Sequence, residues 1–431
     1  MIRLFYWLPM LVGSLFFITD ASYCADWTMH GGVKNESAYF ISGQKRWDTI
    51  QNRLELKPEA VFDNGWEFRS RALLWYDAAM DVRTDNNTDL TPSIKQHYRT
   101  ATQIKEAYLM YGGDAFDLRI GQQQIVWGKT DGLRMLDVVN PLDMREFILD
   151  DFLDSRVGLV AARLNYYPDT EMEQEIELLV IPDARAAQAA PAGSRWAFHT
   201  PTTPAGLSLK TLPTEQPNWS VKNTEYGAAW RGNLEGWDVS ANYFYGWKDS
   251  PNAFRRITPG IMTLQLKHLR MHTLGGSMSN AFGSWVLRGE FAANVQEGIN
   301  ANGLTFADTV QRKTTLNAAI AAEWSAHNWI ISPQFFIRHI QQWNNSLLEP
   351  QDSGFWTLRI ATDFMHEKLK PEILLLADWS AGGWLARPKT AYEWSDQITM
   401  TFGADIFGGN HGFLGQFASN DRIYVETEYT F

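Results

Sequence analysis

The chain of 431 residues contains one cysteine, Cys24, and lacks the motifs that mark common enzymes. A single thiol can form neither an internal disulfide nor a cysteine-based metal site. No G-x-S-x-G or H-E-x-x-H motif is present, and the nine histidines do not cluster with a nucleophile. We therefore expect no enzymatic activity, no metal and no cofactor. The acidic group of Asp150, Asp151 and Asp154 is interpreted as a solvated patch rather than a calcium site.

Long apolar runs and an excess of positive charge are also missing. After Ile18, no stretch approaches the roughly 18 apolar residues of a membrane-spanning helix, and the mean hydropathy is -0.29. The formal net charge of -11 provides no basic face, which excludes nucleic acid as a partner. If the chain enters a membrane, it must do so with strands that close into a barrel, because lipid does not tolerate an open sheet edge.

The N-terminus has the features of a secretory signal peptide. A short positive start precedes an apolar run of 15 residues, Leu4–Ile18, and a polar stretch follows. This run is too short for a bilayer, which takes about 20 residues. We predict a signal peptide over residues 1–25 and a single mature domain over residues 26–431, with cleavage after Ala21 or after Cys24. Lipid attachment to Cys24 is disfavoured because a bulky tyrosine precedes it.

Aromatic residues are abundant, with 19 Trp, 15 Tyr and 24 Phe, and many stand near the ends of segments in which apolar and polar residues alternate. Rings at such positions are typical of the two membrane interfaces of a β-barrel. In the segment Trp66–Asp77, Phe68 and Leu74 fall on one face, while Arg69 and Arg71 fall on the other. Lipid cannot accept the charged face, so this face must line the lumen. A Trp-rich soluble β-protein is the alternative interpretation.

The links between these segments alternate in length, as they do in barrels with short periplasmic turns and long outer loops. The short links are 63–65, 112–116, 168–170, 232–236, 281–284, 326–327, 366–369 and 395–397, and the long loops are 81–100, 128–155, 183–222, 249–266, 297–312, 342–354 and 409–420. With two tight outer links near 42–46 and 380–383, the pattern predicts about 18 strands, with about 16 as the alternative. We therefore predict an all-β fold, a transmembrane antiparallel β-barrel in the outer membrane of a Gram-negative bacterium.

The last ten residues, Arg422–Phe431, carry the most specific signature. Tyr429 and Phe431 fall on the lipid face with the other apolar residues, whereas Arg422 and Glu426 fall on the inner face. This pattern resembles the C-terminal strand that the barrel-assembly machinery recognises in outer-membrane proteins. We therefore expect Tyr429 and Phe431 to form the assembly signal, with the assembly machinery and outer-membrane lipid as partners.

A run that begins at Leu118, LRIGQQQIVWGKTDGLRMLDVVNPLD, contains the pattern R-x-G-x-Q, then W-G, then N-P-x-D. The matching positions are Arg119, Gly121, Gln123, Trp127, Gly128, Asn140, Pro141 and Asp143. This run and the last strands of the chain resemble an uncharacterised porin-like outer-membrane family of Gram-negative bacteria. That family is similar to alginate-export-type barrels, and its members are often associated with RND-type exporters. The resemblance implies a channel or export role, with an RND-type exporter as a further partner, and assigns no solute.

A barrel of this size leaves an aqueous passage unless a loop fills it. In the loop 128–155, Met144, Phe147, Ile148 and Phe152 recur at helical spacing, which predicts a short amphipathic helix. We expect this helix to fold into the barrel and narrow it. A position over the outer rim is the alternative.

Charged residues form the predicted constriction. Acids from the loop and arginines from the strands would set a transverse field of the kind that selects solutes in narrow pores. These residues are Asp143, Glu146 and Asp150 from the loop, and Arg53, Arg69, Arg71, Arg119, Arg163, Arg288 and Arg359 from the strands. Since both signs are present, the charge of the solute stays open. Cross-strand pairing within the wall is the alternative role of each arginine.

Two functions from different classes fit this sequence. The favoured one is a porin-like channel, for the passage of solutes or the export of a product across the outer membrane. The alternative is a barrel that acts as an enzyme or as a surface interaction protein through its long loops. Ion conductance in planar bilayers distinguishes the two.

Overall fold

The computed structural model describes residues 25–83, 91–130, 134–168, 173–199 and 203–431. The predicted signal peptide therefore lies outside the described residues, apart from Ala25, with which the first strand begins. None of the helices in these ranges is long and apolar enough to cross a membrane.

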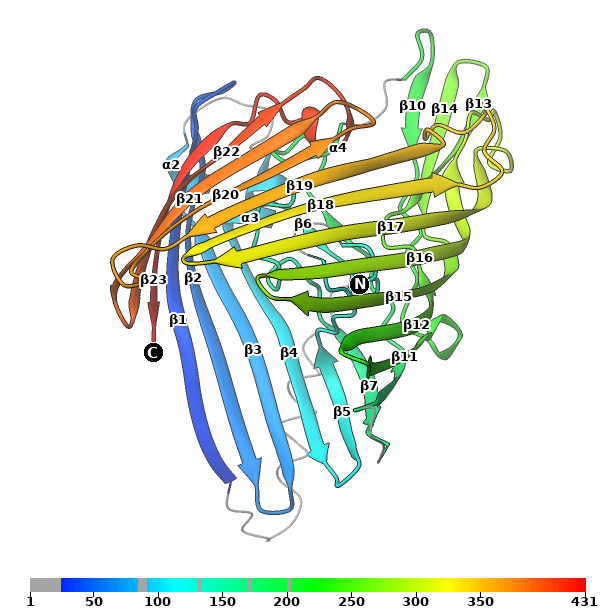
Figure 1. The fold of residues 1–431 in the computed structure, drawn as a ribbon. Coiled ribbons are helices and arrows are strands. Elements are labelled where there is room, and N and C mark those ends of the chain that lie inside the picture. Colours follow the sequence, from blue (N-terminus) through cyan, green and yellow to red (C-terminus); the bar gives the residue numbers. More distant parts are fainter. Residues whose placement is uncertain (1–24, 84–90, 131–133, 169–172, 200–202) are drawn as a thin grey trace, which may run out of the picture.

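An 18-stranded antiparallel sheet closes on itself, because each strand pairs with the next in the sequence and the last pairs with the first (Figure 1). The first strands are β1 (Ala25–Phe40), β2 (Trp47–Phe62), β3 (Trp66–Asp77), β4 (Thr100–Gly112), β5 (Phe116–Gln123), β7 (Leu159–Tyr166), β8 (Glu175–Ile181), β11 (Glu225–Leu234) and β12 (Trp237–Trp247). The remaining strands are β15 (Arg270–Phe282), β16 (Trp285–Asn300), β17 (Val310–Ala326), β18 (Trp329–Ile340), β19 (Asp352–Thr362), β20 (Leu369–Asp378), β21 (Trp384–Ser395), β22 (Ile398–Gly408) and β23 (Arg422–Thr430). The predicted all-β barrel is confirmed, with 18 strands rather than 16.

Apolar side chains point out of this barrel and charged side chains point in. In β3, Leu74 and Tyr76 are exposed on the outer surface, whereas Asp77 is buried inside. In β23, Ile423 is 50% exposed and Arg422 only 4%. Because successive side chains of a strand alternate between faces, each strand supplies both an apolar outer band and a polar lumen.

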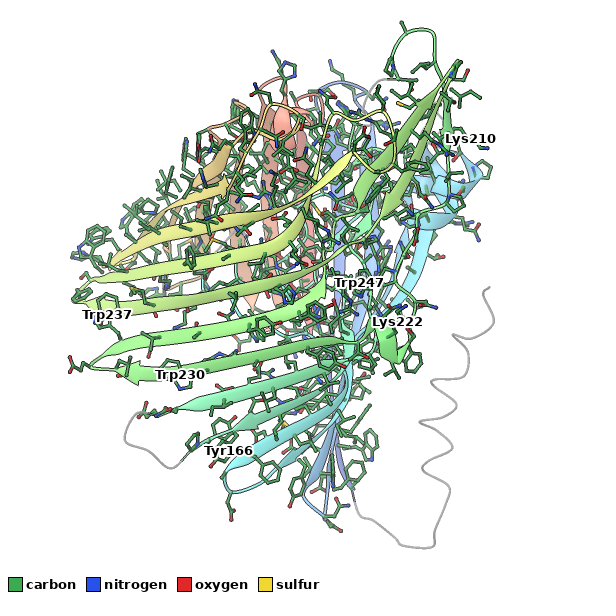
Figure 2. The ribbon with its side chains drawn as sticks, turned by 90° about the vertical axis from the view of Figure 1, so that its right-hand side faces the viewer. Tyr166, Lys210, Lys222, Trp230, Trp237 and Trp247 are labelled. Atoms are coloured by element: carbon green, nitrogen blue, oxygen red, sulfur yellow. The ribbon has the colours of Figure 1, made fainter. Side chains whose placement is uncertain are left out.

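Aromatic rings gather at the end of the barrel where short turns join the strands. Trp66 contacts Tyr111 with 5.4 Å between ring centroids, and Trp237 contacts Phe282 at 5.8 Å. Trp237 and Tyr166 lie at this end of the wall (Figure 2). The short-turn end therefore carries the aromatic belt expected at a membrane interface, and the long loops gather at the opposite end.

The long loops contain the remaining elements. Three strands, β10 (Ser208–Thr211), β13 (Asn252–Thr258) and β14 (Ile261–Lys267), form a small sheet that projects beyond the barrel (Figure 1), and β6 (Asp143–Met144) pairs with β9 (Gln188–Ala189). The helical elements are α2 (Ala79–Val82), α3 (Pro92–Arg99), α4 (Gly412–Gly415) and the 3-10 turn η2 (Val221–Asn223).

The short helix expected in a long loop is present, but it is α3, between β3 and β4. Residues 142–152 form β6 and a series of turns, so the prediction of an amphipathic helix there is wrong. Phe147 has a φ of 58°, which is incompatible with a right-handed helix. In addition, Arg387 of the barrel wall binds the carbonyl groups of Ile148 and Leu149, which a continuing helix would need for its own hydrogen bonds.

Deleting Phe431 tests the closing pair of strands. The N–H and C=O groups of Phe431 exchange hydrogen bonds of 2.9 Å with Gly31 of β1, and a Cβ on Gly31 would lie 2.8 Å from the Phe431 ring. Without Phe431, the pair formed by β1 and β23 loses both hydrogen bonds and the ring contact. We therefore expect less folded, heat-modifiable protein in outer-membrane fractions. Phe431→Tyr keeps these contacts and should keep the yield. Equal amounts of folded protein after the deletion would contradict a role in assembly.

Candidate functional site

We call the loop between β5 and β7, residues 124–158, the strap, and its described residues, 124–130 and 134–158, lie inside the barrel (Figure 1). Arg387 of β21 donates hydrogen bonds to the carbonyl groups of Ile148 at 3.2 Å and Leu149 at 2.9 Å. From β4, the Lys105 ammonium donates to the carbonyl of Asp154 at 2.5 Å. Inward side chains of two separate parts of the wall therefore hold the strap in the lumen, not over the rim.

Two arginines of the wall bind the end of the strap through Asp154. Arg53 of β2 contacts the Asp154 carboxylate at 2.6 Å, and Arg71 of β3 contacts its other oxygen. Burial opposes ionisation of Asp154, but the two guanidinium groups outweigh it and hold the pKa of Asp154 below its ordinary value. Sequence reasoning placed both arginines at the constriction and missed their partner, which it assigned to a solvated patch.

Asp143 and Glu146, two of the predicted constriction acids, are occupied by ion pairs. Asp143 accepts hydrogen bonds from Arg145 at 2.8 Å and from Gln103 at 3.1 Å. Glu146 accepts from Arg195 at 2.6 Å. Their charges are therefore neutralised locally, and they help to fix the fold of the strap.

Asp150 is in a different position from these paired acids. It lines two lumen cavities of ≈ 100 Å³ and ≈ 50 Å³, one on each side of the strap, and Arg53 lines both cavities with it. Burial raises the pKa of Asp150 to about 6, and the carboxylates of Asp143, Glu36 and Asp154 add to this effect. Within the described part of the chain, no hydrogen bond or ion pair involves the Asp150 carboxylate, and no group of three acids or histidines could hold a metal ion.

Most of the other predicted arginines pair within the barrel wall. These contacts are Arg69–Glu67 at 2.9 Å, Arg119–Met110 Sδ at 3.3 Å, Arg163–Glu177 at 2.6 Å, Arg288–Glu323 at 3.4 Å and Arg359–Glu372 at 2.7 Å. Of the predicted set, Arg53 and Arg71 alone contact the described residues of the strap. The structure therefore divides one predicted group into strap-binding residues and wall pairs.

Further charged residues line the larger cavity and were missed as members of the site. They are Lys34 and Glu36 of β1, Arg387 and Lys389 of β21, Arg422 and Glu426 of β23, and Asp151 of the strap. Each of the strand residues has the inward parity that alternation assigns. The alternation of the sequence could therefore have identified these residues as inward-facing. It does not show which inward charges lie at the same height in the lumen.

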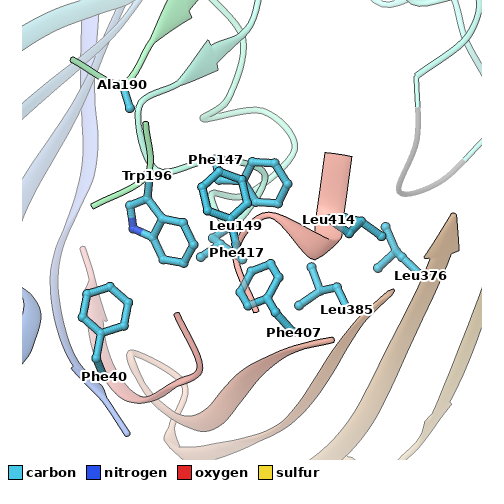
Figure 3. Packing of buried hydrophobic residues seen from close by; sticks show 10 residues of the cluster. All are labelled: Phe40, Phe147, Leu149, Ala190, Trp196, Leu376, Leu385, Phe407, Leu414 and Phe417. Carbon is cyan, nitrogen blue, oxygen red and sulfur yellow. The ribbon is translucent and has the colours of Figure 1, made fainter. Parts of the chain in front are cut away.

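An aromatic cluster packs the strap against the wall near the long-loop end. Phe147 of the strap lies 4.5 Å from Phe417 and 6.3 Å from Trp196, measured between ring centroids. Trp196 and Phe417 belong to the loops before β11 and before β23, and Phe407 of β22 completes the contact (Figure 3). Segments that lie far apart in the sequence thus bury a shared apolar core inside a polar barrel.

On the opposite side, Glu290 of β16 holds the first part of the strap. Its carboxylate accepts hydrogen bonds from the backbone N–H groups of Thr130, at 2.8 Å, and Lys129. Glu290 is only 4% exposed. Since Arg387 binds Ile148 and Leu149 farther along the strap, the described parts of the strap reach from β16 to β21, and a solute that traverses the barrel must pass beside them.

A family model described as "Protein of unknown function (DUF1302)" matches residues 33–431. The sequence matches none of the curated proteins. Among solved structures, the chain is similar to Pseudomonas aeruginosa OpdK with vanillate, at 10% identity and a TM-score of 0.53, covering 94% of this chain and 98% of that one. It is also similar to Pseudomonas aeruginosa OccK2 (OpdF) in complex with glucuronate, at 12% identity, TM-score 0.54 and coverage of 94% and 98%. Acinetobacter baumannii OccAB3 gives 8% identity, a TM-score of 0.55 and coverage of 94% and 99%. These similarities show a shared fold, a closed antiparallel β-barrel.

Replacing Glu290 tests its hold on the strap. Glu290→Ala leaves the buried N–H group of Thr130 and the partly buried N–H group of Lys129 without their acceptor. An unsatisfied buried donor costs about 1–3 kcal/mol, so the folded band should be lost at a lower temperature. Hydrogen exchange at residues 127–130 should also become faster. Glu290→Gln keeps an acceptor oxygen and should be affected less, and Glu323→Ala in the neighbouring strand should leave that exchange unchanged. Unaltered exchange at 127–130 in Glu290→Ala would show that the carboxylate does not hold the strap.

Proposed function

Because this chain belongs to the family described as "Protein of unknown function (DUF1302)" and folds as a porin-like barrel, we propose that it is an outer-membrane channel narrowed by the strap. The observation that carries this proposal is the strap itself, which crosses a charged lumen and has a cavity on either side. A loop that crosses a wide barrel limits the size of what passes and places charge next to it.

The lining of the larger cavity supports charged or strongly polar solutes. Its cations are Lys34, Arg53, Arg387, Lys389 and Arg422, and its carboxylates are Glu36, Asp150, Asp151 and Glu426. Charges of both signs facing one narrow space set a local field that orients dipolar solutes and disfavours apolar ones. The ligands named for OpdK and OccK2, vanillate and glucuronate, both carry a carboxylate, so small carboxylates are a suitable first panel for transport assays.

Other roles have less support in the structure. Export of a product and coupling to an RND-type exporter stay predictions from the sequence resemblance. The alternative of an enzyme or a surface interaction protein predicts a barrel that conducts no ions. Conductance therefore tests the proposed function directly, and a wild-type barrel that is silent at every voltage would reject it.

Neutralising Asp150 tests the contribution of the strap to selectivity. Asp150→Asn removes one unpaired negative charge from both cavities without breaking an ion pair, so the cation-over-anion permeability ratio should fall. The change should shrink with salt, because the Debye length is about 10 Å at 0.1 M and about 3 Å at 1 M. Asp114→Asn, in an exposed short turn, is the matched control. Identical reversal potentials for the wild type and Asp150→Asn would show that the charge of Asp150 does not contribute to ion selectivity.

The raised pKa of Asp150 gives the channel a specific pH dependence. The charged groups close to it are Glu36, Arg53, Lys105, Asp143, Arg145, Glu146, Asp151, Asp154 and Arg387, and among them burial raises the pKa of Glu146 to about 8, so Glu146 titrates above the step of Asp150. With a pKa of about 6, Asp150 is ionised at neutral pH and becomes protonated as the pH falls through 6. Cation preference should therefore fall in a step near pH 6, above the range of ordinary carboxyls at about pH 4. Asp150→Asn should lack this step; its persistence in the variant would assign the titration to another group.

A further inference from the structure

We propose that the outer face of strands β12, β15, β16 and β17 binds a phosphorylated glycolipid of the lipid A type at the long-loop end. Three cations form the site, Lys222 of η2, Arg270 of β15 and Arg312 of β17, and we call it the outer basic patch. The inference requires that the barrel lies in an outer membrane, and it does not depend on conduction by the lumen.

The strand register places both arginines on the outside of the barrel. Arg270 pairs directly with Trp247 of β12, and residues paired across adjacent strands share a face. Leu274, four positions after Arg270 and therefore on the same face, is 48% exposed on the outer surface. On β17, Arg312 has the parity of Ile320, which is 69% exposed. Neither arginine therefore belongs to the charged lining of the lumen.

The patch lies at the level of the lipid headgroups of the outer leaflet. Along β12, Trp237 belongs to the aromatic belt at the short-turn end, and Trp247 ends the strand at the opposite side, beside Lys222 (Figure 2). At about 3.3 Å for each of the intervening residues and a tilt of about 40°, the two rings differ in height by about 25 Å, the height of the apolar band of a membrane barrel. The outward residues between them are Val239, Ala241, Tyr243 and Tyr245. The cations near Trp247 therefore begin where the uncharged band ends.

Neutral partners hold the patch together. The guanidinium carbon of Arg270 lies 4.8 Å from the centre of the Tyr245 ring and 4.6 Å from that of Trp247. The Nη2 atom of Arg270 donates a hydrogen bond of 3.1 Å to the carbonyl group of Lys222. From two strands away, the Nη1 atom of Arg312 donates to the carbonyl group of Arg270 at 2.6 Å. These contacts fix the positions of the arginines and leave their positive charges in place.

In the described part of the chain, no carboxylate pairs with these three residues. The outward positions of β11, β12, β15, β16 and β17 contain no aspartate or glutamate. Glu225 of β11 has the inward parity, and its carboxylate accepts the N–H of Trp247 at 2.7 Å. Farther along the wall, the outward Asp352 of β19 is already paired with His339 at 2.7 Å. A cluster of unpaired cations at a membrane interface is complementary to the phosphates of lipid headgroups.

A glycolipid with more than one phosphate fits the width of the patch. From β12 to β17 the patch covers three strand spacings, about 14 Å at about 4.8 Å for each. Guanidinium groups bind phosphate oxygens through two parallel hydrogen bonds, and the apolar band next to the patch receives acyl chains. Lipid A, which occupies the outer leaflet of an outer membrane, combines two phosphates with several acyl chains, whereas a phospholipid headgroup at this level offers a single phosphate.

Titration of the delipidated, detergent-purified protein, followed by native mass spectrometry, tests this proposal. The probes are lipid A with two phosphates, the same lipid A without phosphate, and a phosphatidylglycerol. We expect the wild type to bind one phosphorylated lipid A and to bind the other two probes more weakly. An interfacial cation contributes about fivefold to the affinity for an anionic lipid, so Lys222→Gln combined with Arg312→Gln should weaken binding of phosphorylated lipid A about 25-fold. Binding of the dephosphorylated lipid should stay unchanged.

Lys210→Gln is the matched control, because it removes an exposed lysine from the projecting sheet, and it should bind like the wild type. Heat modifiability establishes that each variant is folded. If the double variant fails to assemble, Arg312→Gln alone replaces it, with an expected loss of about fivefold. Equal affinity of the wild type and the folded variant for phosphorylated lipid A would overturn the proposal. Wild-type protein that binds dephosphorylated lipid A or phosphatidylglycerol as tightly would also overturn it, because the patch would then not select a phosphorylated glycolipid.

Discussion

Every part of this structure depends on backbone hydrogen bonding in lipid. A strand in hydrocarbon must pair its N–H and C=O groups with neighbouring strands, since no water is available to replace them. The first and last strands satisfy this requirement for each other, from Gly32 opposite Thr430 to Phe40 opposite Arg422. Once the sheet is closed, the two faces of each strand meet different solvents, so outward positions become apolar and inward positions can carry charge.

Charges that are confined to the lumen must find partners there. Arg422 illustrates this: it lies 2.8 Å from Asp48 and from Asp405, and 3.2 Å from Glu36. Such buried pairs add little net stability, but removal of one partner costs about 3–5 kcal/mol because the other charge is left uncompensated. Their main effect here is specificity. Arg53, like Arg422, pairs with carboxylates in a single arrangement. For Arg53, this arrangement includes Asp154 at the end of the strap.

The same strands serve two environments at one level of the barrel. On β21, Arg387 and Lys389 line the larger lumen cavity, while Pro388 and Thr390 lie on the opposite, outer face of the strand. A one-residue shift in the register of this strand would exchange the two sets, which places charge in lipid and proline in the lumen. The charged inner lining and the apolar outer face of the barrel are therefore both tied to the register that closure imposes.

The sequence alone predicted about 18 strands, their inner and outer faces, the ends at which the short turns and the long loops lie, and the lipid-facing C-terminal residues. These features follow from the polarity of each residue and the two-residue period of a strand, which are local properties. It also predicted that acids of the loop between β5 and β7 face arginines of the strands.

Only the tertiary structure decided the path of that loop. The spacing of Phe147 and its neighbours fits a helix as well as turns, and the outcome depends on rings from other loops, such as Trp196 and Phe417, and on Arg387. The same holds for the division of the arginines, because Arg53 meets Asp154 whereas Arg163 meets Glu177. These partners lie far apart in the chain, and a single sequence contains no periodic signal for contacts that exist only after the barrel has closed.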